Sequence, residues 1–239
     1  MNDAEQPWPH GTLFSALNAA EQERWLEQGI RRTYAAGQIF VPRGTVWPYL
    51  FLVQSGKVQA EKESLEGRRL QVLTVNPGEV FWGTAFFLED SRMPVSLEAV
   101  VESSLYLWPR ERLLPLLLEN SKALWHLSQV MVSRMTRASE IVEDLAFQPV
   151  AGRLARLLLE RYGVTGSASM ERDLTLDDMA ARIGSTREMV CRALYRFSDD
   201  DLIQITRTEF TINKPSALAQ LAGLPTPGAE ESPGKRDSP

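Results

Sequence analysis

Residues 174–197, LTLDDMAARIGSTREMVCRALYRF, have the pattern of two short helices joined by a tight turn at Gly184. Ser185 and Glu188 have the S-x-x-E spacing of a capping box, in which each side chain binds a free backbone N–H of the first turn. The second helix is therefore predicted to begin at about Thr186. Two short helices joined in this way predict a helix-turn-helix.

The second helix has one apolar face and one polar face. Apolar residues recur at i, i+3, i+4 and i+7, so they are expected to face the body of the domain: Val190, Ala193, Leu194 and Phe197. The other face carries Arg187, Glu188, Cys191, Arg192 and Tyr195. Arginine bonds guanine O6 and N7 in the major groove, and glutamate accepts from cytosine N4. This face therefore fits a major groove, and the alternative is a surface helix with solvated charges.

A small hairpin is predicted after this helix. Two β-like runs, residues 202–205 and 210–212, flank Arg207-Thr208, which gives the hairpin a basic tip. A hairpin in this position is a wing that would set Arg207 against a DNA phosphate, which fixes register without reading sequence.

The positive charge of this chain is concentrated in one segment rather than spread over its whole length. The chain has 239 residues, 44% hydrophobic and 24% charged, which are globular values that suggest two folded units. Its net charge of −5 is not the basic balance of many nucleic-acid-binding proteins. Residues 148–223 contain ten Lys plus Arg and ten Asp plus Glu, but residues 182–197 contain four arginines and one acid. Positive charge thus lies where DNA contact is expected.

The single cysteine, Cys191, excludes an internal disulfide, a cysteine-bound iron–sulfur cluster and a zinc site built on cysteine pairs. With only His10 and His126, we expect no metal site. The sequence also offers no pair of a nucleophile and a base, so we do not expect this protein to be an enzyme. Without an apolar run near the roughly 18 residues of a membrane span, and without signal-peptide features, the expected location is the cytoplasm.

Short strands are predicted over residues 34–108, preceded by a helix over about residues 14–30. Glycines 37, 44, 56, 67 and 78 give the turn spacing of a sandwich or roll. Residues 49–53 are apolar enough for a strand buried on both faces. In a later strand, apolar residues alternate with polar ones: Val95, Leu97, Ala99 and Val101.

A helical region from about Arg110 becomes long and sustained after Ser121 and reaches about Phe147. Its 3-4 spacing predicts the seam of a two-stranded coiled coil, and hence a dimer, through Leu124, Leu127, Met131, Arg134, Ala138, Ile141 and Leu145. The alternative is a helix packed on its own β domain, which the polar Arg134 leaves open. Pro149 marks a hinge, a further helix spans residues 150–162, and the proline- and acid-rich tail after Leu224 is predicted to be disordered.

A β-roll, a long helix and a winged helix-turn-helix in this order resemble the bacterial Crp/Fnr family of transcription regulators, over about residues 14–223. Residues 187–192 match the family's R-E-x-x-x-R recognition helix, and residues 145–147 match the segment before the hinge. The resemblance implies an α+β fold: a jelly-roll, cyclic-nucleotide-binding-like sensor (1–118), a dimerisation helix (119–147), a winged helix-turn-helix (148–223) and a tail (224–239).

The resemblance also implies a homodimeric transcription regulator, an activator that works with RNA polymerase and reads double-stranded DNA. Its site would be a palindrome like TGTGA-N6-TCACA, read mainly by Arg187, Glu188 and Arg192. The full set of expected DNA contacts is Ser185, Thr186, Arg187, Glu188, Cys191, Arg192, Arg196 and Arg207.

Members of the family that bind cyclic AMP use a glutamate for the ribose and an R-S pair for the phosphate. Gly83 stands at the glutamate position, and Met93 and Pro94 replace the pair, while the adenine-contacting Thr-Ser becomes Ala138-Ser139. A doubly bonded phosphate needs a buried cation and donors. Arg92, one residue away, would serve only if the loop shifted. We therefore do not expect cyclic AMP as the effector.

The same region is aromatic, with Phe81, Trp82, Phe86 and Phe87. These rings either fill the core, which we favour, or line a pocket for an apolar ligand or haem, with His10 and His126 as the conceivable axial ligands. The expected effector pocket comprises Phe81, Trp82, Gly83, Thr84, Arg92, Met93, Ala138 and Ser139.

Cys191 has two interpretations. Between arginines that would lower its pKa, its thiol would be a redox switch whose oxidation blocks DNA binding. We favour the alternative, a small residue tolerated where the helix meets DNA.

Overall fold

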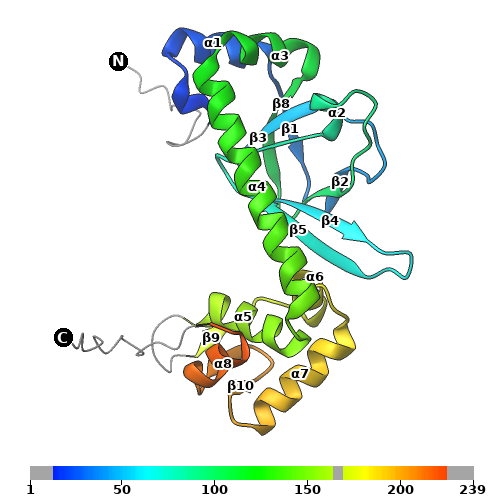
Figure 1. Cartoon of the computed structure of the whole chain (residues 1–239), viewed down its shortest axis with the longest axis vertical. Coiled ribbons are helices and arrows are strands. Elements are labelled where there is room, and N and C mark those ends of the chain that lie inside the picture. The colour runs from blue at the N-terminus through cyan, green and yellow to red at the C-terminus, as the bar shows by residue number, and fades with distance from the viewer. Residues whose placement is uncertain (1–12, 164–168, 225–239) are drawn as a thin grey trace, which may run out of the picture. The chain divides into compact units, whose positions relative to one another are not determined.

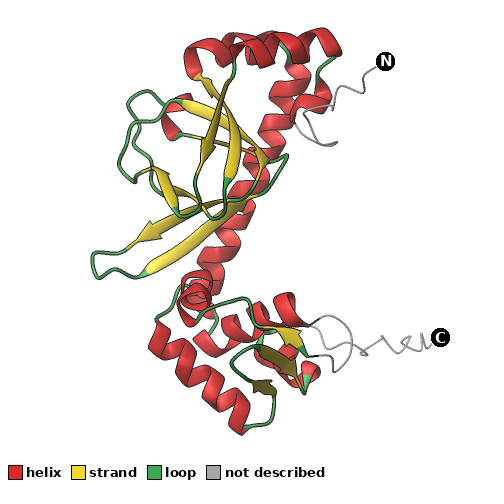
Figure 2. Cartoon of the chain, turned by 180° about the vertical axis from the view of Figure 1, so that it is seen from behind, coloured by secondary structure: helices red, strands yellow, loops and turns green. Residues whose placement is uncertain are grey.

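Two four-stranded antiparallel sheets form the β-roll of this protein, as the computed structural model shows for residues 13–163 and 169–224 (Figures 1 and 2). The strand orders are β1-β8-β3-β6 and β2-β7-β4-β5. The strands are β1 (Ile30–Tyr34), β2 (Gln38–Val41), β3 (Tyr49–Ser55), β4 (Val58–Glu63), β5 (Arg69–Val75), β6 (Val80–Trp82), β7 (Ser96–Ala99) and β8 (Ser103–Pro109). As predicted, residues 50–53 of β3 are buried on both faces.

Two details of this region differ from the prediction. The helix expected over residues 14–30 is a 3-10 turn (Leu13–Ala16) followed by α1 (Ala19–Gln28). Asn18 starts α1 anew, because its side chain accepts from the Glu21 N–H at 3.0 Å while the Glu21 carboxylate accepts from the Asn18 N–H at 2.7 Å. Val101 is 47% exposed, since it lies beyond the end of β7 and outside the alternating pattern.

Three helices complete this part of the chain: α2 (Thr84–Phe87), α3 (Arg110–Glu119) and α4 (Ser121–Phe147). The first turns of α4 lie along the roll in Figure 1, where Ala123 and Leu127 are buried in a core cluster with Phe14 and Trp108. Phe86 is fully buried in the same cluster, as the core interpretation of the aromatic residues predicted. None of the helices in the described residues is long and apolar enough to cross a membrane.

The chain divides into two compact units between Ile141 and Val142, within α4. The second unit contains α5 (Val150–Tyr162), β9 (Met170–Glu171), α6 (Leu176–Ile183), α7 (Arg187–Asp199), β10 (Ile203–Ile205), β11 (Glu209–Ile212) and α8 (Pro215–Leu221). The predicted wing is β10 and β11, and β9 adds an unpredicted third strand in the order β10-β11-β9. His10 and the predicted tail, apart from Leu224, lie outside the described residues.

Candidate nucleic-acid interface

The turn between α6 and α7 is built by local hydrogen bonds. Thr175 and Asp178 form a capping box at the start of α6. Gly184 ends that helix at φ 61° and ψ 50°, a left-handed conformation that glycine adopts without steric cost. The N–H of Ser185 then donates to the Ala180 carbonyl at 2.9 Å, which closes the turn.

The start of α7 differs by one residue from the prediction. The N-cap is Thr186, whose hydroxyl accepts from the Met189 N–H at 3.3 Å, and the helix begins at Arg187. The predicted capping box of Ser185 and Glu188 is wrong, because Ser185 belongs to the closing bond of the preceding turn.

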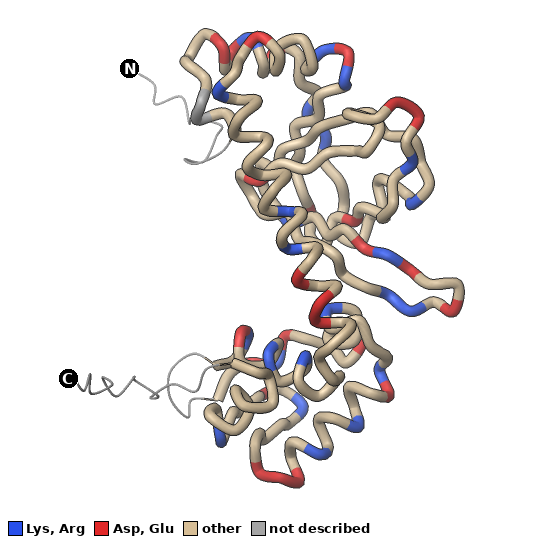
Figure 3. Tube along the Cα trace, viewed as in Figure 1, with Lys and Arg blue, Asp and Glu red and all other residues tan. Residues whose placement is uncertain are grey.

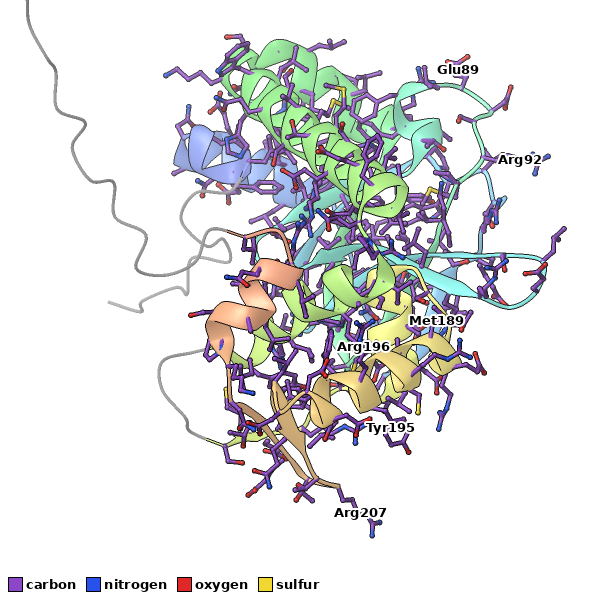
Figure 4. The ribbon with its side chains drawn as sticks, turned by 60° about the horizontal axis from the view of Figure 1, so that its bottom comes forward. Glu89, Arg92, Met189, Tyr195, Arg196 and Arg207 are labelled. Atoms are coloured by element: carbon purple, nitrogen blue, oxygen red, sulfur yellow. The ribbon has the colours of Figure 1, made fainter. Side chains whose placement is uncertain are left out.

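The two faces of α7 are those that the periodicity predicted. Val190, Leu194 and Phe197 are buried, and Ala193 packs against the same cluster. Arg187, Glu188, Arg192, Tyr195 and Arg196 are exposed, while Ser185, Thr186 and Cys191 are half-buried. Figure 4 shows Met189, Tyr195 and Arg196 along the helix surface. Tyr195, which was predicted on this face, is 69% exposed and Met189 is 39% exposed, so both are candidates for DNA contact beyond the predicted set of contacts.

The first turn of α7 holds an exposed arginine and an ionised carboxylate. Nη1 of Arg187 lies 2.8 Å from Oδ2 of Asp177, and both side chains are more than half exposed. Arg187 can therefore exchange Asp177 for a DNA base at little cost. The pKa of Glu188 lies below its usual value, because its backbone N–H and the Thr186 hydroxyl bond the carboxylate and Arg187 is near. Glu188 is therefore suited to accept a hydrogen bond at neutral pH.

The wing presents one basic side chain. Thr206 closes the β10–β11 loop: its N–H donates to the Glu209 carbonyl at 2.9 Å and its hydroxyl accepts from the Glu209 N–H at 2.9 Å. Arg207 is exposed in this loop and projects from the tip of the hairpin in Figure 4. Its position suits contact with a phosphate.

The other end of α7 is acidic. Asp199, Asp200 and Asp201 are all exposed and follow the arginines of the helix, as the blue and red segments of Figure 3 show. Two ion pairs among the described residues offset part of this charge: Arg196 Nε lies 3.9 Å from Asp200 Oδ2 and Lys214 Nζ 3.3 Å from Asp201 Oδ2. The helix is thus positive toward its N-terminal half and negative at its end.

The predicted seam of α4 is only partly exposed, and one part of that prediction is wrong. Leu127 is 1% exposed because it packs in the core of its own β-roll, and Arg134 pairs with Glu79 at 3.7 Å. Leu124 and Leu145 are exposed at 37% and 39%, Ala138 is exposed, and Met131 and Ile141 are half-buried. The more exposed apolar side chains form a row one residue further along, the α4 row: Trp125, Val132, Met135 and Val142.

The predicted effector pocket corresponds in part to a cavity of about 280 Å³ in the first unit. Five of the expected residues line it: Phe81, Trp82, Thr84, Met93 and Ala138. Gly83, Arg92 and Ser139 do not, and neither does His126, the described histidine considered for haem. Residues outside the expected set also line it: Ala60, Lys62, Val72, Leu73, Pro94, Val95, Arg134 and Arg137. Among the described residues, we find no cluster of three metal-ligating side chains.

Two family models match the chain. The one described as cyclic nucleotide-binding domain matches residues 31–120, and the one described as Crp-like helix-turn-helix domain matches residues 152–221. The cyclic AMP receptor protein of Thermus thermophilus is 26% identical over 88% of this chain and 96% of its own length. The global nitrogen regulator of Synechococcus elongatus is 27% identical over 87% of this chain and 95% of its own.

Solved structures share the fold. A transcriptional regulator of the Crp/Fnr family from Eubacterium rectale has a TM-score of 0.73 at 22% identity and covers 92% of this chain and 100% of its own. The c-di-GMP-responsive global regulator CLP of Xanthomonas campestris has a TM-score of 0.72 at 22% identity and covers 82% and 99%.

Proposed function

Because the chain belongs to the Crp/Fnr family of transcription regulators, we propose that it acts as a homodimer that reads a palindromic DNA site of the TGTGA-N6-TCACA type. The observation that carries this proposal is the exposed face of α7, where Arg187, Glu188 and Arg192 stand free of the domain core. It works in the cytoplasm, where bacterial DNA lies, and it has no catalytic activity of its own.

In this mechanism, the N-terminal half of α7 enters the major groove. Arg187 exchanges its exposed partner Asp177 for a guanine, Arg192 reaches a second base, and the ionised Glu188 accepts from cytosine N4. Arg207 of the wing binds a phosphate and sets the register. Tyr195, on the same exposed face, extends the contact to the sugar–phosphate backbone.

The dimer forms through α4 along the α4 row rather than along the seam expected from the sequence. Trp125, Val132, Met135 and Val142 are spaced by 7, 3 and 7 residues and are each more than half exposed. Ser128, Ser139 and Ala146 fill the same 3-4 repeat with small side chains. Two such helices pair with their apolar rows facing, which supports two half-sites about 34 Å apart.

The test is fluorescence anisotropy of the purified protein on a TGTGA-N6-TCACA duplex and on a scrambled duplex, at one stated salt concentration. We expect preferential binding to the palindrome by at least tenfold, and a complex of two chains per duplex by light scattering. Equal binding to both duplexes would contradict the proposed sequence reading, and one chain per duplex would contradict the homodimer. Recruitment of RNA polymerase, and hence activation, is tested by transcription in vitro from a promoter that carries the same site.

A further inference from the structure

The first unit carries a surface groove beside α3 that shares no residue with the 280 Å³ cavity. Its volume is about 600 Å³, and its walls come from the β2–β3 connection, from α2 with the loop after it, and from α3. We call it the α3 groove. Its apolar lining consists of Val46, Pro48, Ala85, Leu114, Pro115 and Leu118.

Hydrogen bonds join the walls of the α3 groove. The N–H of Arg110, at the start of α3, donates to the Pro48 carbonyl at 2.8 Å, and Nη1 of the same residue lies 2.5 Å from Oε1 of Glu89. The loop after α2 is joined to the β2–β3 connection, because Arg92 Nη1 donates to the Gly44 carbonyl at 2.9 Å. The groove is therefore a preorganised surface, which lowers the entropy that binding costs.

The groove is open along an apolar rim. Leu114 and Leu118, four residues apart, give α3 a second apolar stripe besides the leucines that it buries in the core. Leu118 is 66% exposed and Val46 is 41% exposed. Small-molecule sites instead enclose about 70–90% of their ligand's surface, whereas exposed apolar patches mark protein–protein contacts. The α3 groove thus suits a chain segment that enters at one end and leaves at the other.

The charged lining of the groove is mainly acidic. Glu89, Asp90 and Glu111 line it, and Figure 4 shows Glu89 at the surface beyond α2. Arg110, the basic residue of the described lining, is offset by its pair with Glu89. Asp90 and Glu111 are exposed, and neither forms an ion pair within residues 13–163 and 169–224. Such a surface attracts cations and repels DNA.

Pro115 adds a further acceptor. It stands inside α3 and has no N–H to donate to the carbonyl of Glu111, four residues earlier, so this carbonyl lacks its usual helix partner. Together with the carboxylates of Asp90 and Glu111, it favours a partner that carries positively charged donors.

We propose that the α3 groove docks a short segment of a partner protein that is rich in leucine on one face and in lysine or arginine on the other. A leucine-sized side chain packs on Leu114, Leu118 and Val46. Basic side chains pair with Asp90 and Glu111. The docking is separate from DNA reading, because the groove belongs to the first unit and the exposed face of α7 to the second.

The test uses a fluorescein-labelled helical peptide with leucines on one face and lysines on the other, titrated onto the full chain and followed by anisotropy. Two comparison peptides carry glutamate in place of lysine or serine in place of leucine. We expect one lysine–leucine peptide per chain, with an affinity that falls as salt rises, and no binding of either comparison peptide. Absence of binding by the lysine–leucine peptide, or equal binding by a comparison peptide, would overturn the proposal.

A charge variant locates the basic contacts. Asp90→Asn with Glu111→Gln should weaken the lysine–leucine peptide about two- to thirtyfold, the range of two exposed ion pairs. Asparagine tolerates the left-handed conformation of residue 90, where φ is 58°, so the loop keeps its shape. The matched control is Glu23→Gln with Glu102→Gln, which removes two exposed carboxylates outside the groove. Equal weakening in both variants would show general attraction to an acidic chain and would refute the site.

An apolar variant locates the leucine contact. Leu118→Ser should weaken the lysine–leucine peptide about five- to thirtyfold, because apolar burial is lost. Leu65→Ser is the matched control, since Leu65 is fully exposed in the β4–β5 turn. Sedimentation velocity should give one mass for both variants and the wild type. A lower mass in Leu118→Ser alone would mean that a second copy of this chain covers the groove, and would refute the proposal, as would unchanged peptide binding.

The groove and the DNA site are tested apart. The charge and apolar variants should bind the palindromic duplex as the wild type does, because their substitutions lie in the first unit. Peptide binding that follows these variants, without preference for the palindrome, would leave the docking site standing and refute the proposed DNA function. Palindrome binding without peptide binding would do the reverse.

Discussion

Arg192 and Arg207 are both exposed arginines of the second unit, but they should affect DNA binding differently. Arg192→Ala should cost about 1–3 kcal/mol on the palindrome and relax the preference at one base pair, because a bidentate base contact is lost. Arg207→Ala should weaken palindrome and scrambled DNA alike and lower the salt slope by about 1, as expected for a phosphate contact. Anisotropy over a salt series and a set of single-base variants separates the two; identical profiles would contradict these assignments.

The hydroxyl of Thr84 allows a second test at a single atom. The buried Thr84 hydroxyl has no hydrogen-bond partner within residues 13–163 and 169–224. Thr84→Val replaces it with a methyl group of similar shape, so the free energy of unfolding should stay the same or rise by up to about 1–3 kcal/mol. Thr175→Val is the matched control, because that hydroxyl caps α6 and its loss should cost about 0.5–2 kcal/mol. Urea unfolding measures both, and a loss of stability in Thr84→Val would mean that its hydroxyl has a partner in the free protein.

Tyr162 should make the stability of the second unit depend on pH in the alkaline range. Burial, together with the hydrogen bond from its hydroxyl to Asp173 Oδ1 at 2.7 Å and the carboxylate charge, raises its pKa to about 12 from 10.0. Its contribution to stability is therefore fully present below pH 10 and is lost as pH rises through about 12, because the unfolded state releases the proton first. Across this window the unfolding temperature of the wild type should fall more steeply with pH than that of Tyr162→Phe. Parallel curves of unfolding temperature against pH would count against this assignment.

The N-cap of α7 shows why a single capping residue is harder to predict from a sequence than the buried face of a helix. Ser185 and Thr186 are adjacent capping residues, and a motif search selects Ser185 because Glu188 has the right spacing. The choice is made instead by Gly184, whose left-handed conformation commits the Ser185 N–H to Ala180. The buried face of the helix was predictable because it depends on periodicity and not on one bond.

At the scale of elements, the α4 row should control assembly. Val132→Glu with Met135→Glu places two charges on the row and should convert the proposed dimer to a monomer, since burying unpaired charges is strongly unfavourable. Ser133→Glu is the control, because Ser133 is exposed on another side of α4. Sedimentation velocity gives the masses; a dimer that survives the double substitution would place the interface elsewhere.

Arg153 of α5 joins two helix ends within the second unit. Its guanidinium donates to the Gln148 carbonyl at 2.6 Å after α4 and to the Ile183 carbonyl at 2.8 Å at the end of α6. The side chain is half-buried, and this burial lowers the pKa of its guanidinium. Arg153→Met should cost about 1–3 kcal/mol because these carbonyls lose their donor, while Arg182→Met, at an exposed position, should cost little. Equal urea midpoints for the two variants would show that the link is dispensable.

The seam of α4 could not be placed from the sequence for a physical reason. Apolar residues at 3-4 spacing predict that a helix face is covered, but not by what. In α4 one row is covered by the β-roll of the same chain, through Ala123 and Leu127, and a neighbouring row is left exposed. Similarly, the helix expected over residues 14–30 is divided at Asn18, where the side chain accepts a hydrogen bond from the Glu21 N–H.

At the scale of the whole molecule, the α+β architecture was predictable because turn spacing, helix periodicity and the order of elements agree. The cavity was predictable only in part. Phe81, Trp82 and Thr84 were found because they are close together in the sequence, whereas Lys62 of β4 and Arg137 of α4 meet there through strand pairing and helix packing, which leave no local signal.

The acidic end of α7 bears on how the protein finds its site in a genome. A helix that ends in three exposed aspartates, in a domain with as many acids as bases, attracts the uniform charge of noncognate DNA only weakly. Fewer molecules are then sequestered on the millions of competing sites, and occupancy of the right one depends more on base contacts. A cell should therefore need only a small number of copies to regulate its promoters, and those copies should leave one stretch of chromosome quickly when conditions change.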